Sequence, residues 1–361
     1  MPDLLAMHAP GPRSGTIAGV LPSMPPDDDR DPWGPEVSRE VARAAPARSS
    51  SGFYSGAPKS ESGVTGRGVS ESFDGADEDP PEEVEVVPVR RQLSVAIAGF
   101  AALLATGLIL GAQTSGPDAR APYAIVVFGV QALFILAWTM AMRPPAPGVV
   151  AGIAVAAAAL ADYVAANSTV AHLLPLGYVA LGASALTLIG QFIRPADRPR
   201  VKDSYSTTLI IVFGVVAFAS LIMLTRKPIG TQAVMVTLAA AGVALVVARV
   251  ADAVFPKPRI APQVPRGATG VVLGAMLGTL GAAALGSVLV IPFTPAKGAV
   301  LGLVAAVLVG LVDLAVNFTE AGRYMAGEAP TFWLARHMRG PLGAFALASP
   351  AAYALTVFFL S

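Results

Sequence analysis

The sequence contains no cysteine and only three histidines among its 361 residues. Without cysteine, the chain has no disulfide bonds, no thiolate metal sites and no cysteine nucleophile. The histidines, His8, His172 and His337, are too far apart along the chain to suggest a histidine metal cluster. Charged residues are also scarce, at 14%, whereas 54% of the residues are hydrophobic. With a mean hydropathy of +0.62, this composition indicates a polytopic membrane protein and excludes a soluble globular one.

Residues 1–89 differ in composition from the rest of the chain. They are rich in proline, serine, glycine and acidic residues, and they have few long apolar side chains. Such a segment buries too little apolar surface to offset the entropy lost on ordering, so we predict a disordered tail. We interpret it as a solvated tether, with a docking site for a basic partner as the alternative. The apolar run at residues 4–6 is too short for a signal peptide, so we expect the tail to stay attached, on the cytoplasmic side.

Residues 90–361 contain a series of long apolar runs that predict an all-α polytopic bundle of about nine transmembrane helices. Each run is close to the ~20 residues that are needed to cross a bilayer core. The third and fourth runs are so close in sequence that they should form a helical hairpin. The expected spans are residues 93–112, 123–142, 148–166, 170–193, 207–224, 233–255, 270–291, 298–318 and 342–360.

The distribution of basic residues predicts the orientation of these spans. If the amino terminus is cytoplasmic, most arginines and lysines of the short loops fall on the cytoplasmic side, as the positive-inside rule requires. We therefore expect a multi-pass protein of the cell membrane, inner or plasma, with an external carboxyl terminus. Asp162, Tyr163 and His172, at the outer ends of the third and fourth spans, are expected to be interfacial residues with structural roles.

The seventh span carries Gly270, Gly274 and Gly278, one helical turn apart. Glycines at this spacing let helix backbones approach closely in lipid. We expect them to serve packing within the chain, and a homodimer through the glycine-rich helices is the alternative.

The eighth span ends in a polar stripe formed by Asp313, Asn317 and Glu320. Their i, i+4, i+7 spacing places them on one face of a helix. An acid within an apolar run costs about 2.5–3.5 kcal/mol on insertion scales, so Asp313 should face protein or water. Two interpretations are open: Asp313 packs against a neighbouring helix, or it belongs to a site at the cytoplasmic mouth of the bundle. The polar segment 321–339 that follows is expected to be a loop.

Two further groups of polar residues lie close to the cytoplasmic end. Arg249 and Asp252, at i and i+3 near the end of the sixth span, are expected to form a structural ion pair, with a catalytic role as the alternative. The proline-rich loop that follows supplies Lys257, Arg259 and Arg266. This loop either touches lipid phosphate or forms the wall of a phosphate-binding site.

The order of these elements resembles one known family. Residues 255–262 read Phe-Pro-Lys-Pro-Arg-Ile-Ala-Pro and precede a glycine-rich span, and Val312-Asp313-Leu314 ends a later span. Residues 207–361 thereby resemble the phosphatidate cytidylyltransferases (CDP-diacylglycerol synthases), which have a Phe-Gly-Lys-basic-Leu-Ala-Pro segment and a later Gly-Asp-Leu. The resemblance implies a polytopic nucleotidyltransferase of phospholipid biosynthesis that joins CTP to phosphatidate, releases pyrophosphate, and holds Mg²⁺ at buried carboxylates. It suggests as candidates the catalytic residues Asp313 and Glu320, the metal ligands Asp313 and Asp252, and the phosphate or headgroup ligands Lys257, Arg259, Arg266, Arg336 and Arg339.

Most other motif positions of that family carry different residues here. The family's Ser-x-x-Lys-Arg corresponds to residues 317–321, where Glu320 reverses the charge of a phosphate-binding lysine. Its Gly-His-Gly-Gly falls on residues 334–337, Leu-Ala-Arg-His, and its upstream Ser-Asp-Thr-Gly is missing. Because phosphoryl transfer depends on such cations and on metal-binding carboxylates, we predict a catalytically degenerate member that binds lipid headgroups, such as phosphatidate, or partner proteins.

Two alternatives remain open. The first is an active cytidylyltransferase that uses the substituted residues with CTP and Mg²⁺. The second is a small-solute transporter, which is less favoured because the sequence shows no internal repeat. No nucleic-acid partner is expected.

Overall fold

The computed structural model describes residues 87–114, 120–192, 205–328 and 331–360. Of the predicted tail, residues 1–89, only the last three positions belong to these ranges, so the prediction of disorder lies outside the described residues. The fold below is that of the helical part.

Regular secondary structure in the described ranges is helical throughout, without a β-strand. Nine of these helices are long and apolar enough to cross a membrane. The predicted all-α bundle of about nine spans is therefore confirmed, and the protein is a multi-pass membrane protein. The helices are α2 (Arg91–Gln113), α3 (Ala121–Met142), α4 (Pro147–Asn167), α5 (Leu174–Phe192), α7 (Tyr205–Thr225), α8 (Gly230–Val254), α9 (Ala268–Val288), α10 (Pro295–Met325) and α11 (Trp333–Leu355), the last continued by a π-helical turn, Thr356–Leu360.

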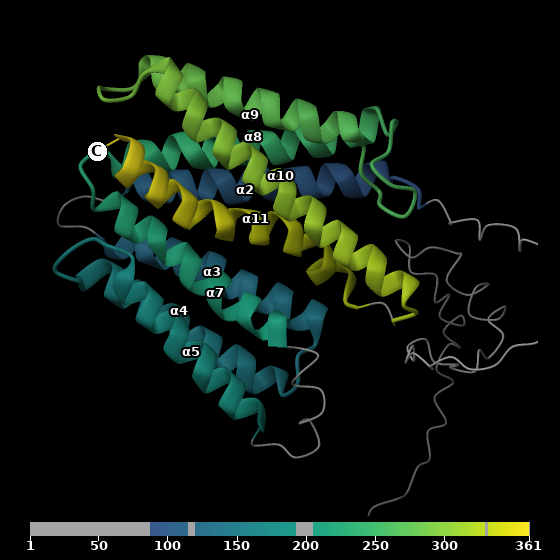
Figure 1. Ribbon diagram of the computed structural model, residues 1–361, viewed down its shortest axis with the longest axis horizontal. Helices are drawn as coiled ribbons and strands as arrows, with labels where there is room; N and C mark the ends of the chain where they lie inside the picture. Colours follow the sequence, from purple (N-terminus) through teal and green to yellow (C-terminus); the bar gives the residue numbers. More distant parts are fainter. Residues whose placement is uncertain (1–86, 115–119, 193–204, 329–330, 361) are drawn as a thin grey trace, which may run out of the picture. The chain divides into compact units, whose positions relative to one another are not determined.

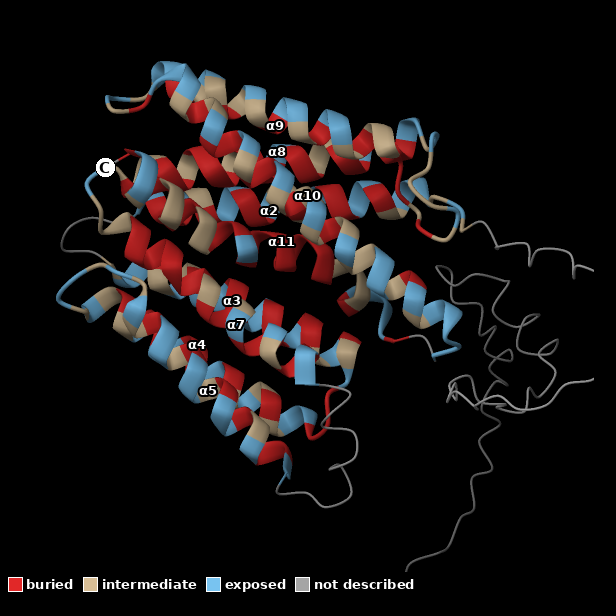
Figure 2. Cartoon of the chain, viewed as in Figure 1, coloured by how far each residue is buried: buried red, intermediate tan, exposed pale blue. Residues whose placement is uncertain are grey.

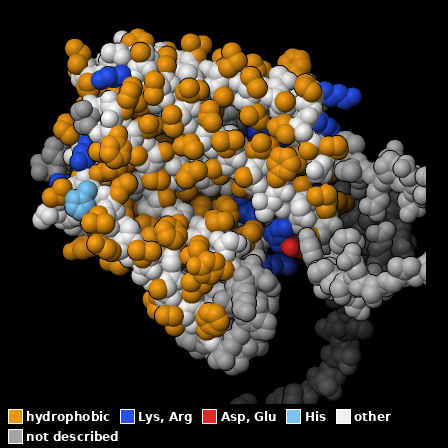
Figure 3. All heavy atoms as spheres, in the orientation of Figure 1, with side chains coloured by type: hydrophobic (Ala, Val, Ile, Leu, Met, Phe, Trp, Pro, Cys, Tyr) orange, Lys and Arg blue, Asp and Glu red, His pale blue; other side chains and the backbone are white. Residues whose placement is uncertain are grey.

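The helices lie side by side, with α9 and α8 along one edge and α4 and α5 along the other (Figure 1). α8 packs against α9 and α2, α10 packs against α9 and α11, and α4 packs against α5 and α7. α7 and α8 are the most buried helices, whereas α9 is the most exposed (Figure 2). Hydrophobic side chains cover much of the visible surface of the helices (Figure 3), as lipid-facing helices require.

The largest departure from the predicted boundaries lies between the last two spans. α10 continues to Met325 and α11 begins at Trp333, so most of segment 321–339, predicted as a loop, is helical. Hydropathy does not reveal these turns, because their charged residues are good helix formers outside the lipid. α11 also runs through Pro341, directly before Leu342, where the last span was predicted to begin. The first turns of α11 therefore present Arg336 and Arg339 on a helix.

The predicted glycine stripe packs α9 against α8. Gly270, Gly274 and Gly278 are buried, and a Cβ atom added at Gly278 would lie 2.7 Å from the carbonyl oxygen of Ala240. The absence of side chains thus lets the two backbones touch. This face is occupied by a helix of the same chain, as expected, and a homodimer through the glycine-rich helices stays a prediction.

Candidate functional site

Four charged side chains meet where α8, α10 and the 255–267 loop come together. Arg249 and Asp252 lie in the last two turns of α8, and Asp313 lies within α10. Arg266 ends the loop that leads into α9. Arg249 is 6% exposed, and the other three have no exposed surface. We call these four residues the charge network.

The 255–267 loop folds back on itself and thereby carries Arg266 into the bundle. The backbone N–H of Ile260 donates to the carbonyl oxygen of Arg266 at 3.1 Å, and that of Ala268 donates to Pro258 at 2.9 Å. Lys257, on the outward part of the loop, is exposed. The loop therefore separates two cations that the sequence had grouped as phosphate ligands.

The charge network pairs two arginines with two carboxylates. Arg249 Nη2 bonds to Asp313 Oδ1, and Arg266 Nη1 bonds to Asp252 Oδ2. Arg266 Nη2 also lies 3.0 Å from Asp313 Oδ2, so this arginine bridges both acids. The backbone N–H of Gly267 donates to Asp252 Oδ1 at 2.9 Å. Buried charges persist only when they are paired in this way, because an unpaired one loses its hydration without compensation.

The partners differ from those that the local spacing predicts. Arg249 and Asp252, expected to pair with each other at i and i+3, form no ion pair with each other in the structure. Arg249 reaches α10, and Asp252 reaches the loop. The ion pairs therefore connect elements of the bundle, and the interpretation of Asp313 as a residue that packs against a neighbouring helix describes its contacts.

Glycines bring two more helices against the charge network. A Cβ atom at Gly340 of α11 would press on Asp313 Oδ1 and lie 3.6 Å from Arg249 Nη2. A Cβ atom at Gly270 of α9 would lie 2.6 Å from the carbonyl oxygen of Ala248 and would press on Asp252. The network is thus enclosed by backbone on both sides.

The donor set around Asp313 does not fit a Mg²⁺ site. Each oxygen of Asp313 faces a guanidinium group, and Asp252 is held by Arg266 and a backbone N–H. Among the described residues, no group of three or more His, Cys, Asp or Glu side chains is placed to hold a metal ion. Mg²⁺ needs oxygen ligands that are free of competing cations. The structure does bring the two predicted metal ligands together, but around an arginine.

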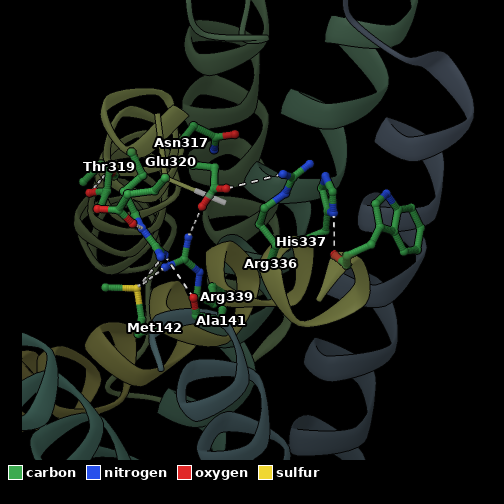
Figure 4. A network of polar contacts seen from close by, with 12 residues as sticks. Ala141, Met142, Asn317, Thr319, Glu320, Arg336, His337 and Arg339 are labelled. Atoms are coloured by element: carbon green, nitrogen blue, oxygen red, sulfur yellow. Dashed lines mark hydrogen bonds and ion pairs between the residues drawn. The ribbon is translucent and has the colours of Figure 1, made fainter. Parts of the chain in front are cut away.

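A second polar group, which we call the arginine cluster, comprises Glu320, Arg323, Arg336 and Arg339. Glu320 points toward both arginines of α11, as Figure 4 shows. Its Oε2 accepts from Arg339 Nη2 at 2.7 Å, and its Oε1 lies 3.5 Å from Arg336 Nη1. Arg323 donates to the carbonyl oxygen of Ala141 at 3.0 Å and to Glu328 at 2.6 Å.

Two arginines of this cluster differ in access to solvent. The side chain of Arg339 is 1% exposed and lies over the ring of Trp138, 5.6 Å from its centroid. The side chain of Arg336 is 29% exposed, and that of Glu320 27%. The predicted catalytic Glu320 is therefore held by two predicted phosphate ligands, and of these only Arg336 is accessible.

Arg259 contacts the segment that precedes α2, and its predicted role as a phosphate ligand stays a prediction. Its Nη1 donates to the backbone oxygen of Val87, the first described residue, and the N–H of Val87 donates to Pro262 at 3.2 Å. The loop thus holds the segment that leads into α2. Arg259 therefore bonds to Val87, whereas Arg266 pairs with Asp252 and Asp313, and Arg336 pairs with Glu320.

The sequence missed Arg249 and Gly340 as members of the site. The sequence did contain a signal for Arg249. Arg249, Asp252 and Asp313 all lie in apolar runs, so each needs an opposite charge nearby. Gly340 gave no such signal, because its role depends on the crossing of α11 and α10.

No family model, no curated protein and no solved structure matches the chain.

Proposed function

We propose that the chain is a catalytically degenerate relative of the phosphatidate cytidylyltransferases that binds anionic lipid headgroups at the end of the bundle where α8 ends and α11 begins. The observation that carries this proposal is that Arg249 and Arg266 occupy both oxygens of Asp313. The family relationship rests on the order of residues 255–262 and 312–314.

The pairing of Asp313 opposes nucleotidyl transfer. A phosphoryl-transfer site needs metal ions and cations that remain open to the nucleotide phosphates. In the charge network, two arginines already neutralise two carboxylates of the same chain. Freeing the carboxylates for a metal ion would leave buried guanidinium groups unpaired, which costs several kcal/mol per ion. We therefore infer that the charge network holds helices together and does not bind CTP and Mg²⁺.

The arginine cluster supports the lipid-binding part of the proposal. Together with Glu328, which pairs with Arg323, the arginine cluster has three positive and two negative side chains, an excess of one positive charge. Guanidinium groups match the geometry of phosphate oxygens, and basic residues at a membrane surface attract anionic lipids. We propose, from the positive-inside rule, that this end faces the cytoplasm, and that the membrane is the cell membrane.

One observation favours the second candidate, an active cytidylyltransferase. Asp252 and Asp313 both contact Arg266, so two carboxylates of the kind that hold a catalytic metal ion converge on one point. Displacement of Arg266 by a nucleotide-bound metal ion would leave those acids as ligands.

An activity assay separates the two candidates. Full-length protein reconstituted in liposomes with phosphatidate is given labelled CTP and Mg²⁺, and Asp313→Asn protein is the matched control. We expect no CDP-diacylglycerol above that control. Asp313-dependent formation of CDP-diacylglycerol would overturn the degenerate assignment and establish the enzyme.

A lipid-binding measurement tests the rest of the proposal. Native mass spectrometry of the purified protein should show retention of phosphatidate over phosphatidylcholine. Arg336→Gln should reduce that preference about fivefold, since one basic residue near a membrane surface is worth about 1 kcal/mol. Lys297→Gln, at the opposite end of α10, serves as the control. Equal preferences in the two variants would contradict headgroup binding at the arginine cluster.

A further inference from the structure

A further polar site, separate from the charge network and the arginine cluster, lies between α3 and α4, near the start of α3 and the end of α4. A hollow of about 600 Å³ there is lined by Arg120, Asp162 and Tyr163, and by apolar residues that include Ile125 and Phe128. Binding sites for small molecules typically have about 300–1,000 Å³. Ile125 is 71% exposed and Tyr163 is 67% exposed, so the hollow opens at the side of the bundle, toward the lipid.

Asp162 in the wall of this hollow is incompletely paired. It is 6% exposed, and its Oδ1 accepts a hydrogen bond from Gln131 Nε2 at 2.9 Å. Its Oδ2 is buried and has no hydrogen-bond partner among the residues described. A buried acceptor without a donor is costly, so this oxygen is a place where a donor group of a ligand would be stabilising.

One arginine, Arg120, lines the mouth of the hollow, and a second, Arg226, lies at the same helix end outside it. Arg120 Nη1 donates to the carbonyl oxygen of Ala166 at 2.7 Å, and Arg226 Nη1 donates to that of Ala165 at 2.9 Å. Burial lowers the pKa of Arg226, and the nearby positive charge of Arg120 lowers it further. Arg120 lines the hollow, whereas Arg226 does not.

The spacing along α4 sets the depth of the two polar groups. Asp162 precedes Ala166 by four residues, which is about 6 Å along a helix that rises 1.5 Å per residue. α4 ends at Asn167, so Asp162 lies deeper in the bundle than the carbonyl that Arg120 contacts. α3 begins at this same end, and Ile125 and Phe128 follow at increasing depth.

We propose that this hollow binds a monoacyl glycerophosphate, with its phosphate at Arg120, its free hydroxyl on Asp162 Oδ2 and its acyl chain along Ile125 and Phe128. Guanidinium is the preferred partner of phosphate, and a hydroxyl supplies the donor that Oδ2 lacks. In such a lipid the glycerol hydroxyl lies on the acyl side of the phosphate, which matches the greater depth of Asp162. The amine of a zwitterionic headgroup lies on the other side of the phosphate, and a diacyl lipid has no hydroxyl at that carbon. This inference does not depend on the proposed function.

Binding of matched probes to the full-length protein tests the assignment. The probes are oleoyl lysophosphatidate, its analogue without the free hydroxyl, dioleoyl phosphatidate, and monooleoylglycerol, each titrated by native mass spectrometry in detergent. Lysophosphatidate should bind about tenfold tighter than the analogue, because leaving a buried acceptor without its hydrogen bond has a cost of that order. Equal binding of these two probes to the wild-type protein would overturn the proposal, without any variant being needed.

Three variants locate the two contacts. Asp162→Ala should abolish the preference for lysophosphatidate over its hydroxyl-free analogue. Arg120→Gln should weaken the binding of lysophosphatidate and of its hydroxyl-free analogue, and it should leave the binding of monooleoylglycerol unchanged. Arg226→Gln is the matched control, because it removes a guanidinium from the same helix end but lies outside the hollow, and it should retain wild-type binding. Equal losses in Arg120→Gln and Arg226→Gln would show that the arginines act only on the structure, and would overturn the assigned phosphate position.

Discussion

Asp313 and Asp162 are both buried acids of the helix bundle, but their surroundings are opposite. Asp313 has a guanidinium group at each oxygen, one of them 3.0 Å away from Oδ2. Asp162 has one amide donor at 2.9 Å and an oxygen without a partner. Similar burial therefore does not mean the same role. Asp313 has a cation at each oxygen, as a structural ion pair requires, whereas Asp162 has no ion pair among the described residues, which leaves room for a ligand.

The packing around the two acids follows the same division. Backbone at Gly340 lies directly against Asp313, so the charge network is closed. Asp162 instead lines a hollow that opens between α3 and α4. If this comparison is correct, substitutions at the charge network should act mainly on stability, and substitutions at the hollow mainly on ligand binding.

The largest effect on stability is expected from Asp313→Ala. It leaves Arg249 unpaired inside the bundle, and breaking a buried ion pair in this way costs about 3–5 kcal/mol. The measurement is the free energy of unfolding, from titration of the protein in mixed micelles with a denaturing detergent. The double variant Arg249→Met with Asp313→Leu should recover most of the loss, since it removes both charges and keeps the volume filled. A double variant as unstable as the sum of its single changes would show that Arg249 and Asp313 are not coupled.

A smaller loss is expected from Gly340→Ala. The added methyl group would press on Asp313 and on the neighbouring guanidinium, and overpacking of this kind costs about 1–3 kcal/mol. Gly322→Ala is the control, because no atom lies within 4 Å of a Cβ atom placed there. That control should be neutral or slightly stabilising, since alanine is the better helix former. A loss of the same size at both glycines would argue against a closed charge network.

The smallest effect is expected from Asp162→Asn. The amide keeps an oxygen for Gln131 and removes an acid that has no cationic partner, so the free energy of unfolding should change by less than about 1 kcal/mol. Asp313→Asn, measured alongside, should destabilise the protein by a larger amount. Equal losses in the two variants would remove the distinction between the two acids.

The sequence predicts the nine spans well because a bilayer requires about 20 consecutive apolar residues, and such runs are visible without any tertiary information. It fails at the ends of α10 and α11, where helices continue outside the lipid in charged residues such as Arg323 and Arg336. Hydropathy measures transfer into lipid and contains no information about those turns.

The candidate site was predictable in part. The resemblance grouped Asp252, Arg266 and Asp313, and the structure places them in one network. The spacing rule assigned Arg249 to Asp252, although its partner is 64 residues away on another helix. A rule based on i and i+3 describes only one helix surface, and the choice between near and distant partners depends on how helices cross. For the same reason, no pattern around Asp162 shows that one of its oxygens is left without a donor.

The equal numbers of positive and negative groups in the charge network have an electrical consequence. Moving one elementary charge across a membrane with a potential of 100 mV changes the free energy by about 2.3 kcal/mol. Two arginines and two aspartates held together have no net charge, so the intact network adds no voltage dependence of its own to a motion of α8 or α10. Loss of a single aspartate would give these helices a charge for the field to act on.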